Sequence, residues 1–435
     1  MRSSPKGCSD YIMVAGQSDI RVKLRPTAMK RMENAAERSK SRRQSRLGEL
    51  ARLFLKLGTI GFGGPAAHIA LMEREVVARR QWLTREEFLD LVGATNLIPG
   101  PNSTELAIHI GRLRAGLPGL VVAGASFILP AFFIVATLGW VYQRFGSLPE
   151  AGALLRGIKP VMVVIVVQAL VSLGRSAVKN VTLGLIGAAA IAATVMRVVD
   201  EVTLLAVAAI GAVLIAWLRG ARTRSRGGSG KRISGSRAMS IGVPASGVMA
   251  TSVAVQATAA TATPVALWPL FLVFAKAGSL LFGSGYVLLA FLQADLVERL
   301  GWLTRAQLLD AIVAGQITPG PLFTTATFIG YHLAGWPGAV AATVGIFAPA
   351  FVFVALSGPI VPALRRSPVA GTVLDAVNVA SLALMTGVTL LLARDALTDP
   401  ITLSIAAAAA LLLMRYRVEP TLLIAAGGII GVLFL

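Results

Sequence analysis

Long apolar stretches recur along most of this chain, and short polar segments separate them. Five lie near residues 51–72, 117–145, 157–175, 181–198 and 202–218, and five more near 266–292, 336–362, 373–394, 400–414 and 420–435. Most of them approach the roughly 20 residues that an α-helix needs to cross a bilayer. The alternating segments of about ten residues that build outer-membrane barrels do not occur in the sequence. The pattern predicts an all-α integral membrane protein, folded as a polytopic helical bundle.

Composition strengthens this prediction. Of the 435 residues, 55% are hydrophobic and 14% are charged, and the mean hydropathy is +0.73. A chain this apolar cannot bury its hydrophobic side chains in one water-soluble core, so most of it must face lipid. Gly and Ala fill many of the apolar stretches, as in the run from Ala406 to Ala410. Small side chains let helices pack closely in lipid, where no hydrophobic force drives them together.

The formal charge of +20 is concentrated in two segments. Lys and Arg crowd residues 21–52, and they crowd the linker again between Arg219 and Arg237. Because both runs flank apolar helices, they indicate a positive-inside topology and contact with anionic membrane lipid, and nucleic-acid binding is the weaker alternative. Residues 1–46 are polar and lack the apolar run of a signal peptide, which predicts a disordered cytoplasmic tail. Cys8 is the only cysteine, so an internal disulfide and a thiolate metal cluster are excluded. No cofactor or metal site is expected.

An internal repeat organises the apolar part of the chain. At an offset of 220 residues, Lys56-Leu57-Gly58 matches Lys276-Ala277-Gly278, and Pro99-Gly100-Pro101 matches Pro319-Gly320-Pro321. Duplicated halves are typical of secondary transporters, whose substrate sites lie near the midplane where the halves meet. The predicted units are a basic tail at 1–46, a first repeat at 47–218, a Gly/Ser/Ala-rich basic linker at 219–263 and a second repeat at 264–435.

Each repeat contains a short helix that a Pro-Gly-Pro sequence must end. Thr84 with Glu87, and Thr304 with Gln307, have the spacing of a capping box and predict helix starts. The first proline of each motif then leaves about fourteen helical residues, too few to cross a bilayer, which predicts a broken or re-entrant element. The alternative is that each Pro-Gly-Pro sequence only kinks a helix, and that neighbouring helices satisfy the freed backbone groups.

The helix that follows each motif would begin with unpaired backbone N–H groups and the positive end of a helix dipole, which attract oxyanions. The candidate substrate-binding residues are Pro99, Gly100, Pro101, Asn102, Ser103 and Thr104 in the first half, and Pro319, Gly320, Pro321, Thr324 and Thr325 in the second. Glycine-containing segments form a second pair of breaks, with Phe62, Gly63, Gly64 and Pro65 in the first half and Phe282 and Gly283 in the second. Because glycine has no side chain, these breaks would let a ligand or a helix approach the backbone.

Charged side chains within apolar stretches are candidates for charge coupling, because burying them is costly. Lys56 and Lys276 recur at the same repeat position, and snorkelling to the interface is the alternative for Lys56. Arg74 lies in a charged cluster, predicted to be a salt-bridged surface loop, from which it could guide anions.

Three titratable residues near the broken turn are further candidates. Glu105 is a candidate proton carrier, since partial burial favours the protonated form of a carboxyl, and a pair with Arg112 or Arg114 is the alternative. His68 and His109 could titrate near neutrality, or could serve only in packing.

These residues resemble the chromate ion transporters, in the long form that carries two homologous domains in one chain. The resemblance rests on residues 62–68 (FGGPAAH), 82–83 (WL), 97–103 (LIPGPNS) and 319–323 (PGPLF), and it covers roughly residues 50–435. It implies efflux of chromate, recognised as a tetrahedral dianion like sulfate and driven by the membrane potential or a proton gradient. In the second half, residues 284–286 (SGY) depart from residues 64–66 (GPA), so equal roles for the two sites do not follow.

Two arguments about topology conflict. Treating the Pro-Gly-Pro elements as re-entrant leaves five crossings in each half, an odd number, so the repeats would be inverted. Basic runs at both the N-terminus and the linker instead indicate an even number of crossings between them. An extra crossing within residues 238–263 would reconcile the two.

The sequence thus predicts a secondary active transporter of a divalent oxyanion in the plasma membrane, with chromate first and sulfate or another oxyanion as the alternative. A non-transporting membrane scaffold is the less favoured hypothesis. The sequence has no Cys or His cluster, nucleophile elbow or dinucleotide fingerprint, so no enzymatic activity is expected. The sequence does not decide between a monomer and a homodimer.

Overall fold

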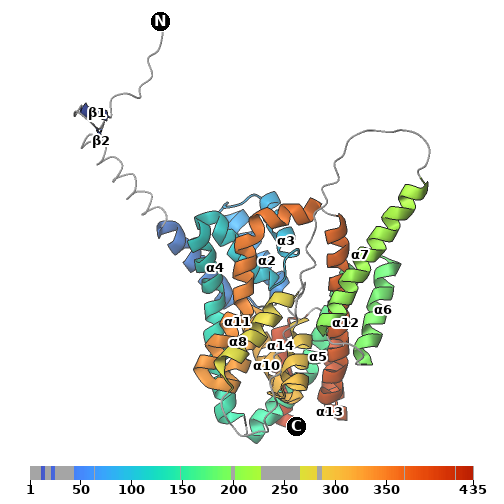
Figure 1. The fold of residues 1–435 in the computed structure, drawn as a ribbon. Helices are drawn as coiled ribbons and strands as arrows, with labels where there is room; N and C mark the ends of the chain where they lie inside the picture. The colour runs from blue at the N-terminus through green and yellow to red at the C-terminus, as the bar shows by residue number, and fades with distance from the viewer. Residues whose placement is uncertain are drawn as a thin grey trace.

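The computed structural model describes residues 11–14, 21–24, 44–62, 64–146, 148–196, 201–226, 265–281, 287–366, 368–416 and 418–434. Apart from two short strands near the N-terminus, these residues are mainly helical, which confirms the predicted all-α class. Figure 1 shows the helices gathered into one bundle, with the two strands outside it.

The two halves of the chain share one order of elements. The first contains a helix over residues 44–60, α2 (Gly64–Glu73), the π-helix η1 (Arg74–Arg79), α3 (Arg85–Thr95), α4 (Asn102–Phe145), α5 (Pro149–Ala177), α6 (Val181–Val195) and α7 (Glu201–Arg226). The second contains α8 (Leu267–Leu280), α9 (Leu288–Leu292), the π-helix η3 (Gln293–Arg299), α10 (Arg305–Ile317), the 3-10 turn η4 (Leu322–Thr324), α11 (Thr325–Arg366), α12 (Pro368–Ala396), α13 (Pro400–Arg415) and α14 (Pro420–Phe434).

Capping boxes start the short helix of each repeat, as the sequence predicts. The Thr84 hydroxyl accepts a hydrogen bond from the Glu87 backbone N–H, and the Glu87 carboxylate accepts one from the Thr84 N–H. Thr304 and Gln307 form the same reciprocal pair at the start of α10. Each pair satisfies two backbone donors that a helix N-terminus otherwise leaves free.

The helices α4 and α11 each consist of two arms joined by a tight turn. At Ala115 and Gly116 the backbone of α4 leaves the helical conformation, and Gly116 has a φ of +69°. A Cβ atom on Gly111 would collide with the backbone of Gly119, so the two arms lie in direct contact. The equivalent positions of α11 behave in the same way: Gly330, Ala334, Gly335 and Gly338. The first arms are therefore short re-entrant helices, and the second arms are long membrane helices.

The long arms of α4 and α11 run in opposite directions. Gly124 of α4 lies against Phe351, whereas Phe132, further along α4, has its ring centroid 6.4 Å from that of Trp336. The short arm of each helix also contacts the long arm of the other, through Gly139 with Tyr331 and through Arg112 with Ser357. This reciprocal arrangement places the two repeats in inverted orientation.

The first apolar stretch of each half is interrupted. One helix ends at residue 60 and α2 begins at Gly64, and α8 likewise ends at Leu280. In Figure 1 the helix over residues 44–60 begins at the same end of the bundle at which α7 ends. The five crossings expected in each half and the extra crossing suggested within residues 238–263 stay predictions, because residues 227–264 lie outside the described part of the chain.

Among the described residues, length and composition mark four helices as able to span a membrane: α4, α5, α11 and α12. The shorter apolar helices complete the bundle, and close packing of small residues joins α5 to α14. A Cβ atom on Gly157 would collide with the backbone of Gly427 and Gly431. This packing is the use of small side chains that the composition predicts.

Two short strands that the sequence does not predict lie in the N-terminal segment. The strands β1 (Tyr11–Val14) and β2 (Arg21–Leu24) pair in antiparallel register. The first helix of the bundle is already formed at residue 44, before the predicted boundary at residue 47. β-branched and aromatic residues such as Tyr11, Ile12 and Val22 favour the strands locally. The other residues before 44 lie outside the described part of the chain.

Candidate functional site

Each Pro-Gly-Pro turn is bonded to the opposite repeat. The Gly100 N–H donates to the Leu281 carbonyl at 2.7 Å, and the Gly320 N–H donates to the Gly61 carbonyl at 2.8 Å. Gly61 and Leu281 occupy equivalent positions, directly after the first helix of each repeat. Each turn therefore sits at the break in the other repeat, and the two candidate sites lie where the repeats meet.

Glycine is required at the centre of both turns. Gly100 and Gly320 have φ values of +142° and +98°, in the region that side chains rarely adopt. A Cβ atom on Gly320 would also lie 2.9 Å from the Cβ of Ala131 and 3.2 Å from the Gly58 carbonyl oxygen. The missing side chain of Gly320 therefore lets the backbone of the turn approach the first repeat closely.

His68 connects the two breaks in the first repeat. Its Nε2 lies 2.8 Å from the Gly61 carbonyl oxygen, so Nε2 carries a proton, and its Nδ1 lies 3.2 Å from the Ser103 hydroxyl. The Gly61 carbonyl therefore accepts from both His68 and Gly320. The ring is 2% exposed and packs edge-on against Phe127. The structure brings His68 into the candidate site, where it positions the turn through hydrogen bonds.

The first turn of α4 retains polar groups without partners. Asn102 donates its amide to the side-chain oxygen of Asn96 at 2.7 Å, while its own buried Oδ1 has no hydrogen-bond partner among the described residues. The Thr104 hydroxyl is fully buried and is equally without a partner there. Such groups are costly to bury unless a ligand or water meets them. The N–H groups of this turn also lack acceptors within the helix.

Glu105 is fully buried beside this turn. Both of its carboxyl oxygens lack hydrogen-bond partners among the described residues, and its side chain lies against Gly100. The predicted alternative, a pair with Arg112 or Arg114, is wrong. Arg112 donates to the Val354 carbonyl, and Arg114 forms an ion pair with Glu49 at 3.4 Å.

His109, one helical turn after Glu105 on α4, is 7% exposed, and its Nε2 has no hydrogen-bond partner among the described residues. The predicted packing role for this histidine therefore leaves one ring nitrogen unsatisfied.

The second turn uses its hydroxyls locally. Thr324 donates to the Pro321 carbonyl at 2.8 Å, and Thr325 donates to the Leu322 carbonyl at 2.9 Å. These hydroxyl protons are therefore engaged within the turn, which differs from the expected parallel with the first repeat. The reason is that a 3-10 turn places the carbonyl of residue i−3 within reach of each side chain.

The second pair of predicted breaks is described only in part. Phe62 is 44% exposed, Gly64 has a φ of +75°, and Pro65 occupies the first turn of α2. Pro99, Pro101 and Pro319 bound the turns described above. Gly63, Phe282 and Gly283 lie outside the described residues.

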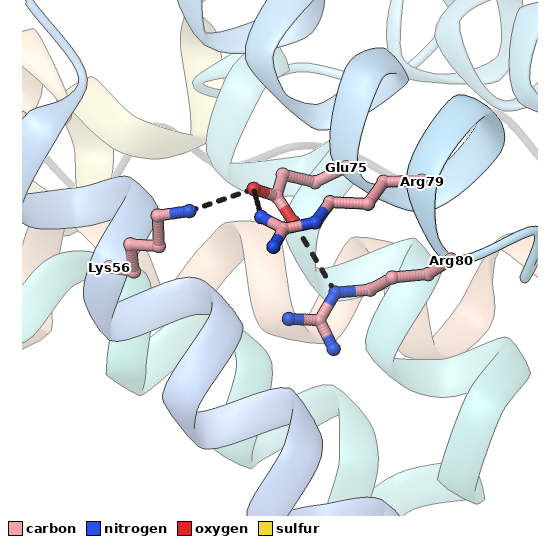
Figure 2. Close-up of polar contacts among 4 residues, drawn as sticks. All are labelled: Lys56, Glu75, Arg79 and Arg80. Atoms are coloured by element: carbon pink, nitrogen blue, oxygen red, sulfur yellow. Dashed lines mark hydrogen bonds and ion pairs between the residues drawn. The ribbon is translucent and has the colours of Figure 1, made fainter.

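The charged cluster of the first repeat surrounds Glu75 (Figure 2). Lys56 lies 2.8 Å from the Glu75 carboxylate, and Arg79 and Arg80 approach it at 3.3 and 3.4 Å. The Lys56 ammonium, which donates a hydrogen bond to Glu75, holds the pKa of that carboxyl below its usual value. The residues Arg74–Arg79 form a π-helix, so the predicted surface loop is wrong, while the predicted salt bridges are present. Arg74 is exposed.

The second repeat contains an equivalent cluster. Lys276 lies 2.9 Å from both carboxylate oxygens of Asp295, and Arg299 lies 3.2 Å from one of them. Lys56 and Lys276 are each 19 residues before their acidic partners. Their recurrence therefore reflects a duplicated ion pair that joins the first helix of each repeat to its π-helix.

A third polar cluster lies among residues that the sequence does not mark as candidates. Lys159 of α5 lies 2.9 Å from Asp310 of α10, and the Tyr142 hydroxyl of α4 donates to the same carboxylate at 2.8 Å. The rings of Tyr142 and His332 pack with centroids 5.6 Å apart. Each residue stands alone in an apolar segment, so no local motif marks them. A charge within an apolar helix, as at Lys159, is the signal that could have found them.

These features together define a class of protein. Inverted repeats, helices broken near the middle of a membrane bundle, and two oppositely inserted turns are the architecture of a secondary transporter. The chain belongs to the chromate transporter family, whose model matches residues 48–217 and 268–432. The two matched regions correspond to the two repeats.

Relatives support this membership along most of the chain. The chain is 32% identical to the chromate transport protein of Cupriavidus metallidurans, over 88% of this chain and 92% of that one. It is 31% identical to the chromate transport protein of Pseudomonas aeruginosa, over 70% of this chain and 71% of that one. No solved structure matches the fold.

Proposed function

We propose that this protein exports chromate from the cytoplasm across the plasma membrane, as a secondary active transporter. The observation that carries the proposal is the insertion of each Pro-Gly-Pro turn into the break of the opposite repeat. Two helix beginnings, whose first N–H groups lack acceptors within the helix, would then face one interface between inverted halves. The names of the related chromate transport proteins support chromate as the substrate.

The first turn is the stronger oxyanion site. Backbone N–H groups at the start of α4 and the unpartnered Thr104 hydroxyl are hydrogen-bond donors, and a tetrahedral dianion accepts from several donors at once. Donors of this kind recognise charge and shape, which chromate and sulfate share. Sulfate or another divalent oxyanion is therefore the alternative substrate.

Alternating access would exchange the contacts between the repeats. In the conformation described, the Gly100 and Gly320 N–H groups are both bonded to the opposite repeat. Rocking of one repeat against the other would release these two bonds and open the interface on one side at a time. The energy would come from the membrane potential or a proton gradient.

Glu105 is the proposed proton carrier. A carboxylate that is fully buried without a partner is strongly disfavoured, so the closed interface selects the protonated form. Opening would expose Glu105 to water and allow it to lose the proton. The side chain lies against Gly100, so its protonation state and the geometry of the turn would be coupled.

The basic runs in the tail and in the linker would face the cytoplasm and contact anionic lipid, because clustered Lys and Arg residues favour that side. The helix over residues 44–60 begins at the end of the bundle at which α7 ends, as Figure 1 shows. Substrate would then enter from that end and leave at the opposite end.

Flux of radiolabelled chromate in everted membrane vesicles tests the proposal. We expect uptake that collapses with an uncoupler and that falls when sulfate is added as a competitor. If the inserted protein moves no chromate but does move sulfate, the substrate assignment is wrong. If it moves neither, the scaffold hypothesis gains and transport of these anions is refuted.

A further inference from the structure

The cluster of Lys159, Asp310, Tyr142 and His332 lies within the membrane helices and plays no part in the site described above. Lys159 stands ten residues after the start of α5, roughly 15 Å along the helix. Its side chain is 15% exposed, and that of Asp310 is 7% exposed. A charge pair at such a position is costly to keep and marks a functional site rather than a device for stability.

Four elements converge on this cluster. Tyr142 lies on the long arm of α4, Lys159 on α5, Asp310 on α10 and His332 on the short arm of α11. His332 also lies 3.2 Å from the side-chain nitrogen of Gln307, and its Nδ1 has no hydrogen-bond partner among the described residues. The cluster therefore joins both repeats, on the approach to the second Pro-Gly-Pro turn.

Other charges near α10 are engaged elsewhere. Arg305 pairs with Asp395 at 3.9 Å, and Asp295 of η3 pairs with Lys276 and Arg299. Helix α14 contains no charged residue. Within the described residues, Asp310 is the only acidic group that forms an ion pair with Lys159.

The cluster has no counterpart in the other repeat. At the equivalent positions, Lys159 is replaced by Asn378, Tyr142 by Val361 and His332 by Leu113. Asp310 is matched by Asp90, but Asp90 is exposed. The duplicated ion pairs around Glu75 and Asp295 hold the fold in both halves. The pair of Lys159 and Asp310 occurs in one arrangement only, as expected for a functional role and not for a fold-stabilising one.

The carboxylate of Asp310 receives the contacts that an oxyanion would receive. It forms an ion pair with the Lys159 ammonium through one oxygen and accepts a hydrogen bond from the Tyr142 hydroxyl through the other, and a negatively charged oxygen favours both kinds of contact. We propose that Lys159 and Tyr142 form a second binding station for the divalent oxyanion, between the second Pro-Gly-Pro turn and the end of the bundle where α10 begins. Asp310 occupies the station when it is empty, and the arriving anion takes its place at Lys159.

This inference rests on the proposed transport of an oxyanion, and it supplies what the first station lacks. Helix dipoles offer about half a positive charge each, so two helix beginnings neutralise about half of a dianion. Asp310 precedes Pro319 by nine residues, roughly 13 Å along a helix. A full positive charge at that distance gives the dianion a second place to bind on its way out.

Substitutions separate this role from that of a structural ion pair. We would compare Lys159→Gln, Lys159→Arg, Asp310→Asn and the double variant Lys159→Gln/Asp310→Asn, each measured for membrane insertion, chromate flux and stabilisation of the purified protein by sulfate. A structural pair predicts that the double variant recovers flux, because removing both partners of a buried pair is nearly neutral. The binding station predicts that the double variant recovers insertion but keeps a reduced flux at low chromate concentration.

We expect the apparent KM for chromate to rise at least tenfold in Lys159→Gln and in the double variant, and to remain within about threefold in Lys159→Arg. Sulfate should stabilise the wild-type protein against heat more than it stabilises the double variant. Recovery of normal flux and KM in the double variant would overturn the inference. If the wild-type protein shows neither flux nor stabilisation by chromate or sulfate, the proposed function itself fails, which is a distinguishable result.

Discussion

Gly320→Ala tests whether the contact between the repeats depends on the missing side chain. The substitution places a methyl group on a residue with a φ of +98°, which costs about 1–2 kcal/mol in backbone strain. The new Cβ would lie 2.9 Å from the Ala131 Cβ and 3.2 Å from the Gly58 carbonyl, and crowding of this kind costs about 1–3 kcal/mol. The expected loss of stability is therefore about 2–5 kcal/mol, unless the turn withdraws from Gly61.

Two glycines serve as matched controls. Gly301 has a φ of +61° but open space around its Cβ position, so Gly301→Ala carries the strain without the crowding. Gly48 lies in a helix with open space around it, and Gly48→Ala should stabilise the protein by about 0.5–1 kcal/mol. The difference between Gly320→Ala and Gly301→Ala isolates the contact with the opposite repeat.

Thermal unfolding in detergent and chromate flux in vesicles would be measured for all three variants. We expect Gly320→Ala to unfold at the lowest temperature and to lose flux, and the two controls to keep it. If Gly320→Ala matches Gly301→Ala in both measurements, the close approach at Gly61 has no energetic importance and the reasoning is wrong.

Three further predictions concern single features. Asn102→Ala, Pro99→Ala and Pro321→Ala should each abolish flux while the protein still inserts, since they alter the turns; intact flux in all three would refute the site. Glu105→Gln should remove the pH dependence of flux, because the amide cannot exchange a proton, and an unchanged pH profile would reduce Glu105 to a structural role. Thr84→Ala should cost about 1 kcal/mol of stability by removing a helix cap, measured by thermal unfolding, and an equally stable variant would show that the cap is redundant.

Much of the fold follows from local signals in the sequence. The capping boxes at Thr84 and Thr304, the broken helices at the Pro-Gly-Pro motifs and the apolar segments depend on residues close together in the chain. The internal repeat can also be recognised in the sequence, because the same signals recur at equal spacing in both halves. These features were predicted correctly for that reason.

The sequence predicts the break at residues 62–65 from its glycines and Pro65, but it does not predict what the break contacts. Residues 51–72 are otherwise apolar enough to form one membrane helix, and the first helix ends at residue 60. The break is filled by Gly320, which is distant in sequence and donates to the Gly61 carbonyl. A hydrogen bond between residues so far apart cannot be read from either segment alone.

The sequence by itself determined the membrane class, the duplication and the positions of the broken turns, because periodicity and turn chemistry act over a few residues. Only the tertiary structure decided which groups meet. It left Glu105 without either predicted arginine, engaged the hydroxyls of Thr324 and Thr325 within their own turn, and brought Lys159 to Asp310. The physical reason is that hydrogen bonds and ion pairs act over a few ångströms, and inverted packing of the repeats sets those distances.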